Sequence, residues 1–328
     1  MTPKATSRPA AATAQRPLFR KRLLAWYDRQ RRHLPWRRDR DPYHVWLSEI
    51  MLQQTRVAAV IEYYERFLLR FPTVKNLAAA RQSSVLAAWS GLGYYRRARM
   101  LHRAARKVVK EHGGKFPASA ADLQKLPGIG RYTAAAIASI AFGEPVAVVD
   151  GNVERVLRRV LGKRLDGDAL WRSAEELLSR RRPGDFNQAM MELGATVCLP
   201  RQPMCLACPV LDFCATRGET ERPEREIRNK REIHYALDRR DGKVWMVERP
   251  KAASLMPGMW ELPEISSPNG APPAWLTLRH SITVTDYVVR VARCPAEGTE
   301  GHWVPESRIP ALPLTGLARK ILRAVNVI

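Results

Sequence analysis

Four cysteines crowd into one short stretch of this 328-residue chain, at Cys198, Cys205, Cys208 and Cys214. Thiols this close in sequence can converge on one centre. Bringing all four to one centre would restrict the path of the chain more than any other feature of the sequence. The bunching is unlike the disulfide framework of a secreted protein and favours a metal site in a reducing compartment. Zinc and an iron–sulfur cluster both accept four thiolates, and the spacing C-x6-C-x2-C-x5-C leaves the choice between them open.

The chain before this cysteine loop is patterned for helices. Apolar residues recur at helical spacing throughout 18–215, and Gly, Pro or Asp separates the runs. The longest run covers 45–71 and predicts one long amphipathic stretch. We therefore predict an all-α domain over 18–215. Residues 1–17 contain no acidic residue and are predicted to form a disordered basic arm, with a transit peptide as the alternative.

The character of the sequence changes after residue 215. Residues 216–231 are almost wholly polar and are predicted to be a linker. Beyond the linker, the dipeptide Asp241-Gly242 between two strand-like runs predicts a β-hairpin. Many β-branched residues in 281–294 indicate a further strand, and 313–325 has the pattern of a closing helix. We therefore expect a second, α+β domain over 232–328.

The charge of the chain points to its partner. Lys and Arg number 55 and Asp and Glu 32, so the formal net charge is +23. This excess favours nucleic acid as partner, with an anionic membrane surface second and a merely soluble basic protein third. No apolar run approaches the length of about 20 residues that spans a bilayer, and no secretory signal is evident. We expect a monomeric, cytoplasmic protein without a membrane partner, associated with the nucleoid if it is bacterial.

Residues 121–143 predict a helix, a tight turn and a second helix. Ser119 and Asp122 form a capping box for the first helix. Gly128 and Gly130 in the turn permit positive φ angles and a close approach of the backbone. The amide groups of the turn and of the next helix could then face a phosphate. Taken alone, the same residues also fit an ordinary turn between helices.

Taken together, these motifs resemble those of a known superfamily. The cysteine spacing is similar to the [4Fe–4S] loop of the endonuclease III-like DNA glycosylases, and L-P-G-I-G resembles their helix-hairpin-helix. The segment W-L-S-E-I-M-L-Q-Q-T (46–55) resembles the MutY-type adenine DNA glycosylases. The resemblance implies a six-helix barrel with a [4Fe–4S] cluster at 198–214, followed by a Nudix-like lesion-recognition domain. It also implies double-stranded DNA with adenine opposite 8-oxoguanine or G as the substrate.

Two carboxylates are the predicted catalytic pair. Asp150 follows an apolar run and begins a helix, so it is first of all an N-cap. A carboxylate there also suits a reaction that develops positive charge on a sugar, such as cleavage of an N-glycosidic bond. Glu49 lies in an apolar stretch where burial would raise its pKa, although a solvent-facing Glu is commoner. The resemblance assigns Glu49 as the acid and Asp150 as the stabiliser of the sugar cation.

The resemblance alone supplies the remaining roles in catalysis and DNA binding. Tyr132 stands where bifunctional endonuclease III enzymes carry a Lys, so we expect a monofunctional glycosylase that leaves the strand uncut. Asn152 matches a residue of the sugar and water site, and Arg37 one that lines the adenine pocket. The predicted DNA and lesion contacts are Leu52, Gln53, Gln54, Thr55, the aromatic wedge Tyr94, Gly128 and Gly130. Arg96, Arg97 and Arg99 are expected to meet phosphates.

The second domain departs from the family pattern in one loop. Where the family often carries Phe-Ser-His, this chain has Ile282-Thr283-Val284, so Thr283 can replace the serine hydroxyl while the histidine is missing. Ser281 and Thr283 are the candidate lesion contacts. No Glu-rich Nudix metal motif is found, and no pyrophosphatase activity is expected. A thymine mismatch glycosylase and a non-enzymatic iron–sulfur DNA-binding protein are the alternative functions.

Overall fold

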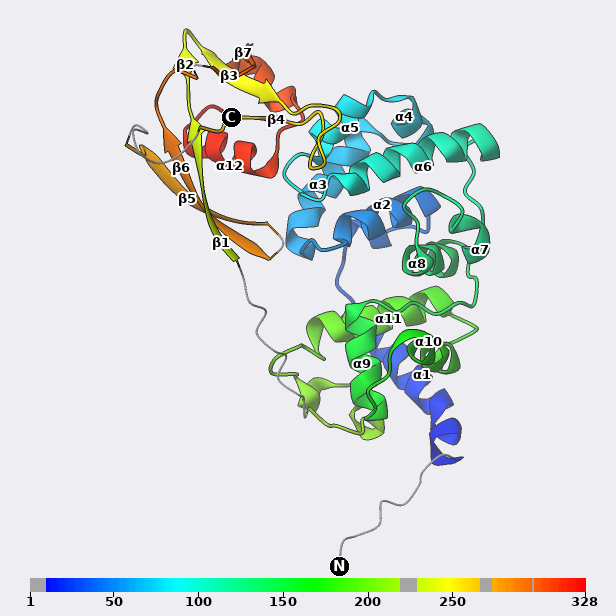
Figure 1. Ribbon diagram of the computed structural model, residues 1–328. Coiled ribbons are helices and arrows are strands. Elements are labelled where there is room, and N and C mark those ends of the chain that lie inside the picture. Colours follow the sequence, from blue (N-terminus) through cyan, green and yellow to red (C-terminus); the bar gives the residue numbers. More distant parts are fainter. Residues whose placement is uncertain (1–9, 219–228, 266–272, 283, 297) are drawn as a thin grey trace, which may run out of the picture. The chain divides into compact units, whose positions relative to one another are not determined.

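The computed structural model describes residues 10–218, 229–265, 273–282, 284–296 and 298–328, which are coloured in Figure 1. The chain forms two compact units, and each is built from two separate segments. Unit 1 comprises Met1–Gln53 and Lys107–Arg222, and unit 2 comprises Gln54–Arg106 and Pro223–Ile328. This division differs from the predicted boundary at the 216–231 linker, because residues 54–106 share their contacts with the C-terminal segment.

Unit 1 is helical, without a strand among its described residues, as the sequence predicts. Its elements are α1 (Ala10–Gln30), η1 (Pro35–Arg37), α2 (Pro42–Leu52), the end of α6 (Arg96–His112), α7 (Ala120–Leu123), α8 (Arg131–Ala141), α9 (Gly151–Leu161), α10 (Gly167–Leu177), α11 (Pro183–Thr196), η2 (Cys205–Ala207) and η3 (Leu211–Phe213).

Helix α8 lies at the centre of unit 1. All residues from Thr133 to Ile140 are buried, and both α2 and α11 pack against this helix. Small side chains allow these helices to approach closely. On α11, a Cβ atom added at Gly184 would lie only 2.6 Å from the carbonyl oxygen of Ser139 on α8. Of these three helices, α2 carries Glu49 and α8 carries Tyr132.

Two predictions about helix ends are corrected. Helix α1 begins at Ala10, so residues 10–17 of the predicted disordered arm are helical, in keeping with the helix propensity of their alanines. Residues 1–9 lie outside the described residues. The predicted stretch over 45–71 is two helices, because α2 ends at Leu52 and α3 begins at Val57. Gln54 has a φ of 57°, a left-handed conformation that interrupts a helix.

Unit 2 combines helices with two small sheets (Figure 1). Its elements are α3 (Val57–Arg70), α4 (Val74–Ala79), α5 (Gln82–Trp89), the start of α6, β1 (Asn229–Ala236), β2 (Arg239–Arg240), β3 (Lys243–Glu248), β4 (Trp260–Glu261), β5 (Leu276–Ile282), β6 (Thr285–Ala292), β7 (His302–Pro305), η4 (Glu306–Ala311) and α12 (Gly316–Ala324).

The sheets of unit 2 enclose a core with α12. In one sheet, β6 pairs parallel to β1 and antiparallel to β5. In the other, β3 pairs antiparallel to β2, β4 and β7. Side chains of both sheets and of α12 form one buried apolar cluster, which includes Val244, Val289 and Ile321. The α+β character predicted for the C-terminal part of the chain is therefore present.

The predicted hairpin turn is confirmed at Asp241-Gly242, whose φ angles of 50° and 67° suit a tight two-residue turn. Its first strand is only β2, because β1 pairs with β6 in the other sheet. Strand β1 also begins at Asn229, inside the predicted linker. Among the described residues, no helix combines the length and apolar composition that crossing a bilayer requires.

Candidate active site

Glu49 is buried on α2, with 7% of its surface exposed. Burial raises its pKa from 4.5 to about 7, while a hydrogen bond from Tyr132 counteracts part of that rise. The charge of Asp150 raises the pKa further and that of Arg37 lowers it. The buried alternative for Glu49 is therefore correct, and the solvent-facing one is not. A carboxyl group in this state can hold a proton at neutral pH.

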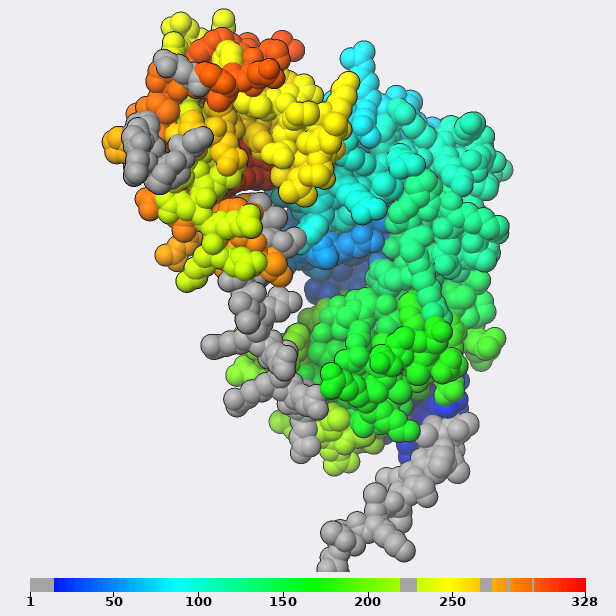
Figure 2. Space-filling view, viewed as in Figure 1, coloured from blue at the N-terminus to red at the C-terminus, as the bar shows by residue number. Residues whose placement is uncertain are grey.

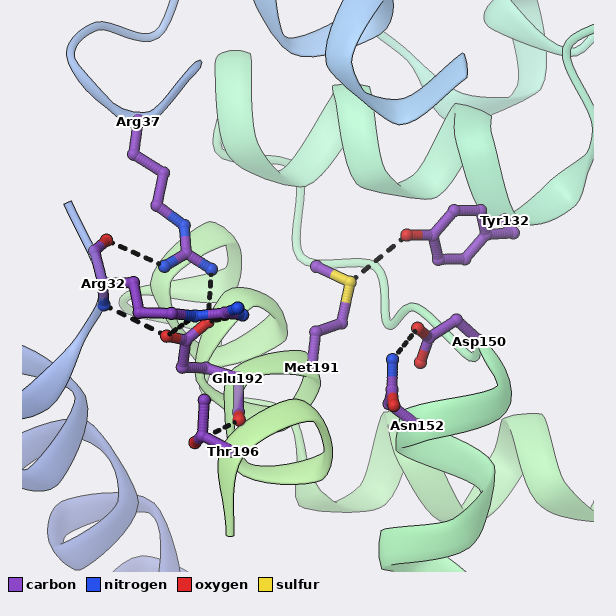
Figure 3. Close-up of polar contacts among 8 residues, drawn as sticks. All are labelled: Arg32, Arg37, Tyr132, Asp150, Asn152, Met191, Glu192 and Thr196. Atoms are coloured by element: carbon purple, nitrogen blue, oxygen red, sulfur yellow. Dashed lines mark hydrogen bonds and ion pairs between the residues drawn. The ribbon is translucent and has the colours of Figure 1, made fainter. Parts of the chain in front are cut away.

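Tyr132 connects Glu49 to helix α11. Its hydroxyl donates to Oε2 of Glu49 over 2.6 Å, and its oxygen lies 3.2 Å from Sδ of Met191, as Figure 3 shows for the methionine. Burial raises the pKa of Tyr132 well above its usual value, and the charges of Glu49 and Asp150 raise it further. The hydroxyl therefore stays protonated and acts as a hydrogen-bond donor.

Asp150 is the N-cap of α9, as the simpler interpretation of the sequence predicts. Its Oδ1 accepts from the amide of Val153 over 2.7 Å. Its Oδ2 accepts from the side-chain amide of Asn152 over 2.9 Å (Figure 3). The same carboxylate acts electrostatically on Glu49 and Tyr132. Capping fixes the carboxylate at the helix start, and unit 1 thus brings Glu49, Tyr132 and Asp150 together from α2, α8 and α9.

Arg37, predicted to line a base pocket, is held by a carboxylate that the sequence reasoning missed. Glu192 of α11 accepts from Arg37 over 2.9 Å and from Arg32 over 2.7 and 2.8 Å (Figure 3). Burial pushes the pKa of Glu192 up, but the hydrogen bonds from Arg32 and Arg37 outweigh it and lower the pKa to about 2. Glu192 is therefore an ionised anchor for both arginines.

Helix α11 also sets the position of Asn152. A Cβ atom added at Gly194 would lie 2.6 Å from Cβ of Asn152, so only glycine allows this approach. Arg155 donates to Oδ1 of Asn152 over 2.8 Å, to the carbonyl of Gly194 over 2.7 Å and to that of Cys198 over 2.8 Å. Asn152 is thus fixed from two sides.

The sequence contains a feature that points to Glu192 of α11 as a buried charge. Glu192 stands in the apolar run Met190-Met191-Glu192-Leu193, the same setting that drew attention to Glu49. A charged residue in such a run is buried only when it is paired. That rule could have identified Glu192 as a functional candidate, although it could not have named Arg32 and Arg37 as partners.

The turn between α7 and α8 carries the two glycines that were predicted to approach a phosphate. Ser119 caps α7 by accepting from the amide of Asp122 over 3.1 Å. Gly128 has a φ of 76°, as predicted. Gly130 does not: its φ is −88° and its ψ 179°, because it is the N-cap of α8 with an extended backbone. Both glycines are exposed, and no atom lies within 4 Å of the position of a Cβ at Gly130.

The residues predicted to contact the strand opposite the adenine follow α2. Leu52 is half-buried at the end of the helix, and Gln53 donates to the hydroxyl of Thr133 over 3.3 Å within unit 1. The next two residues belong to unit 2. Gln54 is exposed in its left-handed conformation, and Thr55 accepts from Arg97 over 3.1 Å.

Tyr94, the predicted wedge, is 45% exposed on the loop between α5 and α6. The neighbouring arginines differ from the prediction that all three meet phosphates. Arg96 is exposed, but Arg97 is half-buried, and burial lowers its pKa to about 10. Arg99 donates to the carbonyl of Pro257. Arg97 and Arg99 are therefore occupied by contacts within unit 2.

The candidate lesion loop is the turn of the β5–β6 hairpin. The hydroxyl of Ser281 donates to Oδ1 of Asp286 over 2.6 Å, so it is engaged within the hairpin. Thr283 lies outside the described residues. The side chain of Asp286 is a local negative charge that the sequence reasoning overlooked.

The four clustered cysteines line one pocket, and none of them forms a disulfide. Apolar side chains complete its wall: Val156, Val160, Leu193, Val197, Val210 and Leu211. Buried Arg159 donates to Sγ of Cys198 over 3.2 Å and to the carbonyl of Leu199 over 2.7 Å. Burial raises the pKa of the Cys208 thiol to about 11, and the other three cysteines contribute to the rise. These thiols therefore lie close enough to influence one another.

Comparisons with known proteins place the chain among DNA repair proteins. The HhH-GPD superfamily of base excision DNA repair proteins matches residues 47–178. The adenine DNA glycosylase of Homo sapiens is 52% identical over 221 residues, which are 63% of this chain and 40% of the human protein. That of Arabidopsis thaliana is 41% identical over 296 residues, 74% of this chain and 46% of the plant protein. The chain thus spans less than half the length of either relative.

One solved structure is similar to this chain over nearly the whole length of the solved protein. The structure of a thermostable thymine-DNA glycosylase superposes with a TM-score of 0.60 at 32% sequence identity, covering 63% of this chain and 98% of the other. The match shows that 63% of this chain shares the fold of that glycosylase.

Proposed function

This chain belongs to the HhH-GPD superfamily of base excision DNA repair proteins, and from that membership we propose that it is a monofunctional adenine DNA glycosylase. Its substrate is adenine opposite 8-oxoguanine or G in double-stranded DNA. The observation that carries the proposal is buried Glu49, with a pKa of about 7, beside Tyr132 and Asp150. The adenine glycosylases of human and Arabidopsis support the choice of base.

In the first step, Glu49 acts as general acid. The adenine leaves the base stack for the enzyme, as base-modifying reactions require. Tyr132 donates to Oε2 of Glu49, so Oε1 carries the proton that passes to N7 of the adenine. Protonated adenine accepts the electron pair of the breaking C1′–N9 bond. The raised pKa keeps the acid form populated near neutral pH.

In the second step, Asp150 stabilises the positive charge that develops on the sugar. Its N-cap contact and the Asn152 amide hold the carboxylate in place. Glu49, now ionised, takes a proton from a water molecule, and the oxygen of that water bonds to C1′. Free adenine and an abasic strand result. Tyr132 offers no amine that could attack the sugar, so the strand remains intact.

Each unit contributes its own predicted contacts to the duplex. In unit 1 these are Leu52, Gln53, Gly128 and Gly130, and in unit 2 Gln54, Thr55, Tyr94, Ser281 and Thr283. Support comes from the exposed turn before α8, the exposure of Tyr94 and the net charge of +23. The proposal includes a monomer in the cytoplasm.

We also propose that Cys198, Cys205, Cys208 and Cys214 hold a [4Fe–4S] cluster. Four thiols on one apolar pocket, none in a disulfide, form a donor set that fits such a cluster. When bound, such a cluster would give the loop a rigid anchor. Iron and sulfide in equal amounts are expected, and stoichiometric zinc would contradict the proposal.

Removal of thymine from mispairs is the second candidate, because the similar solved structure is a thymine-DNA glycosylase. Thymine has no N7 to accept a proton from Glu49. Glu49 therefore has a role as the acid in the removal of adenine, and it has no such role in the removal of thymine.

The test offers labelled duplexes containing A:8-oxoguanine, A:G or T:G to the metallated protein. Cleavage at the adenine only after alkali is expected. Removal of thymine would select the second candidate, and nicking without alkali would contradict the monofunctional assignment.

Glu49→Gln tests the acid directly. The variant keeps the size of the side chain and an acceptor for Tyr132 but has no carboxyl proton to transfer. We expect excision to fall at least about a thousandfold, near the upper part of the range for general acid catalysis, while binding to the A:G duplex is retained. Glu62→Gln, on exposed Glu62 of α3, is the control and should excise normally. Full activity of Glu49→Gln would remove this residue from the mechanism.

A further inference from the structure

The loop that carries Tyr94 holds an unfavourable backbone conformation. Tyr94 has a φ of 49°, a left-handed conformation that is rare for a bulky side chain. Its ring is nevertheless 45% exposed, so burial of the ring does not hold it there. Such a conformation persists only where the surroundings fix it. The contacts of loop 90–95 within unit 2 therefore reveal what sets the position of the wedge.

Part of the support comes from the two flanking helices. The indole of Trp89 donates to the carbonyl of Gly93 over 3.2 Å. Arg97 donates to the same carbonyl over 3.3 Å, and its guanidinium lies 5.4 Å from the centre of the Tyr94 ring. These contacts join residues that are close in sequence.

The other part comes from residues more than two hundred positions later in the chain. The carbonyl of Leu314 accepts from the hydroxyls of Ser90, over 2.7 Å, and Tyr95, over 3.0 Å. Arg319 of α12 donates through Nε to the hydroxyl of Ser90 over 3.0 Å. Leu314 is fully buried, and Ser90 and Tyr95 are 2% and 4% exposed. Water therefore cannot easily replace these hydrogen bonds.

The packing around these hydrogen bonds is equally tight. A Cβ atom added at Gly91 would lie 2.1 Å from the hydroxyl oxygen of Tyr63 and 3.3 Å from Cδ of Arg319. The amide of Gly91 donates to the hydroxyl of Tyr95 over 3.2 Å. Figure 2 shows the yellow part of the C-terminal segment lying against cyan residues of the same unit. Arg99 and Pro257 form one of the hydrogen bonds between these two segments.

We propose that Leu314–Arg319 is a latch that holds loop 90–95 in the conformation with which Tyr94 opens the DNA stack. Ser90, Tyr95 and Arg319 are thus positioning residues, and the C-terminal segment acts in extrusion of the adenine as well as in lesion recognition. The inference rests on the proposed function, because it takes Tyr94 as the wedge. Breaking the latch lets Tyr94 relax from its left-handed conformation and slows extrusion.

The test compares Tyr95→Phe with wild type on two duplexes. Each duplex contains 2-aminopurine at the adenine position, and the fluorescence of this base rises when it leaves the stack. In one duplex the base lies opposite G, and in the other it lies opposite an abasic site. Extrusion from the paired duplex should slow about fivefold to tenfold, the worth of one buried hydrogen bond. Opposite an abasic site the base leaves the stack more easily, so the wedge matters less and the rate should stay within about twofold.

Tyr235→Phe is the matched control. Tyr235 is 6% exposed in the apolar cluster of unit 2, so this variant also loses one buried tyrosine hydroxyl but leaves the latch intact. It should extrude like wild type on both duplexes. Equal slowing on both duplexes, or equal slowing by Tyr95→Phe and Tyr235→Phe, would overturn the latch and indicate a loss of stability only. If Tyr95→Phe does not fold, Arg319→Met removes a donor to Ser90 from the other side and carries the same test.

Tyr94→Ala separates this inference from the proposed function. Slow extrusion by Tyr94→Ala together with normal extrusion by Tyr95→Phe and Arg319→Met would overturn the latch alone. A wild-type protein that excises adenine from no duplex would overturn the proposed function, and the latch with it.

Discussion

At the scale of single residues, the state of Glu49 depends on a balance between neighbours. Burial and the charge of Asp150 favour its protonated form, while Tyr132 and Arg37 favour the ionised form. The resulting pKa of about 7 places both forms within reach at neutral pH. This suits a group that first gives up a proton and then accepts one.

The pH dependence of excision follows from this balance. Only protonated Glu49 can start the reaction, and its raised pKa keeps the proton on up to about pH 7. The single-turnover rate should therefore be level below about pH 7 and fall about tenfold per pH unit above it. Tyr132→Phe removes the hydrogen bond that favours the ionised form, so its rate should fall only at higher pH. If the rate of Tyr132→Phe began to fall at the same pH as that of wild type, or at a lower pH, the role of Tyr132 would be contradicted.

The sequence predicts these residues unequally well. Glu49 stands in an apolar run and Asp150 precedes a helix, but only the resemblance to the adenine DNA glycosylases selected them as the catalytic pair. The contact between Tyr132 and Glu49 joins residues 83 positions apart and depends on how α2 packs against α8, which local pattern does not specify. For the same reason, the sequence shows the charge of Arg97 but not its half-buried position beside Trp89 and Tyr94.

At the scale of secondary-structure elements, helix α11 holds three of the candidate site residues in position. Met191 contacts Tyr132, Glu192 holds Arg37, and Gly194 admits Asn152. Three functions thus come from one helical turn, and none depends on contact with the reacting bond. The sequence predicted a helix here but no site residue, because the partners of α11 come from α8, α9 and η1.

Glu192→Gln should lower the free energy of unfolding by about 3 kcal/mol, because it leaves two arginines without their buried carboxylate. The side chain of Glu192 is fully buried, and that of Arg37 is 13% exposed. Urea denaturation measures the change. Glu176→Gln is the control, because Glu176 pairs with Arg16 but is 57% exposed, and should cost less than about 1 kcal/mol. Equal losses in both variants would show that Glu192 is no anchor.

Gly194→Ala should disturb catalysis more than stability. The new methyl group would meet Cβ of Asn152 at 2.6 Å and push the start of α9, with Asp150, away from its place. We expect a loss of about 1–3 kcal/mol in stability and about a hundredfold in excision rate, the effect of a small misplacement of a catalytic group. Glu176→Gln, an exposed substitution on α10, is the control and should excise normally. Near-wild-type excision by Gly194→Ala would contradict the positioning argument.

At the scale of the whole molecule, the positive charge and the division into two units bear on how DNA is bound. A net charge of +23 supplies attraction that does not depend on sequence, while the candidate base contacts supply selectivity. The sequence predicted a helical part and an α+β part, and the structure contains both. It could not show that residues 54–106 join the C-terminal segment, because that grouping rests on contacts such as Tyr95 with Leu314.

Affinity for an undamaged duplex should fall steeply with salt. Each neutralised phosphate contributes about 0.9 to the slope of log affinity against log salt, so a slope steeper than about −4 is expected. Fluorescence anisotropy between low and moderate salt measures it. Arg96→Gln removes one exposed cation and should make the slope shallower by about one unit. A slope near zero would rule out phosphate contacts as the main source of affinity.

Because unit 2 consists of two segments that lie far apart in the sequence, it can complete its fold only late in translation. Residues 54–106 leave the ribosome long before 229–328, yet Ser90 and Tyr95 find their hydrogen-bond acceptor only at Leu314. The early helices must therefore wait, with these polar groups still hydrated, until nearly the whole chain has been translated. A nascent chain that stalls after the cysteine loop would carry the residues of the catalytic cluster but an unfinished wedge, and it would be a natural target for chaperones.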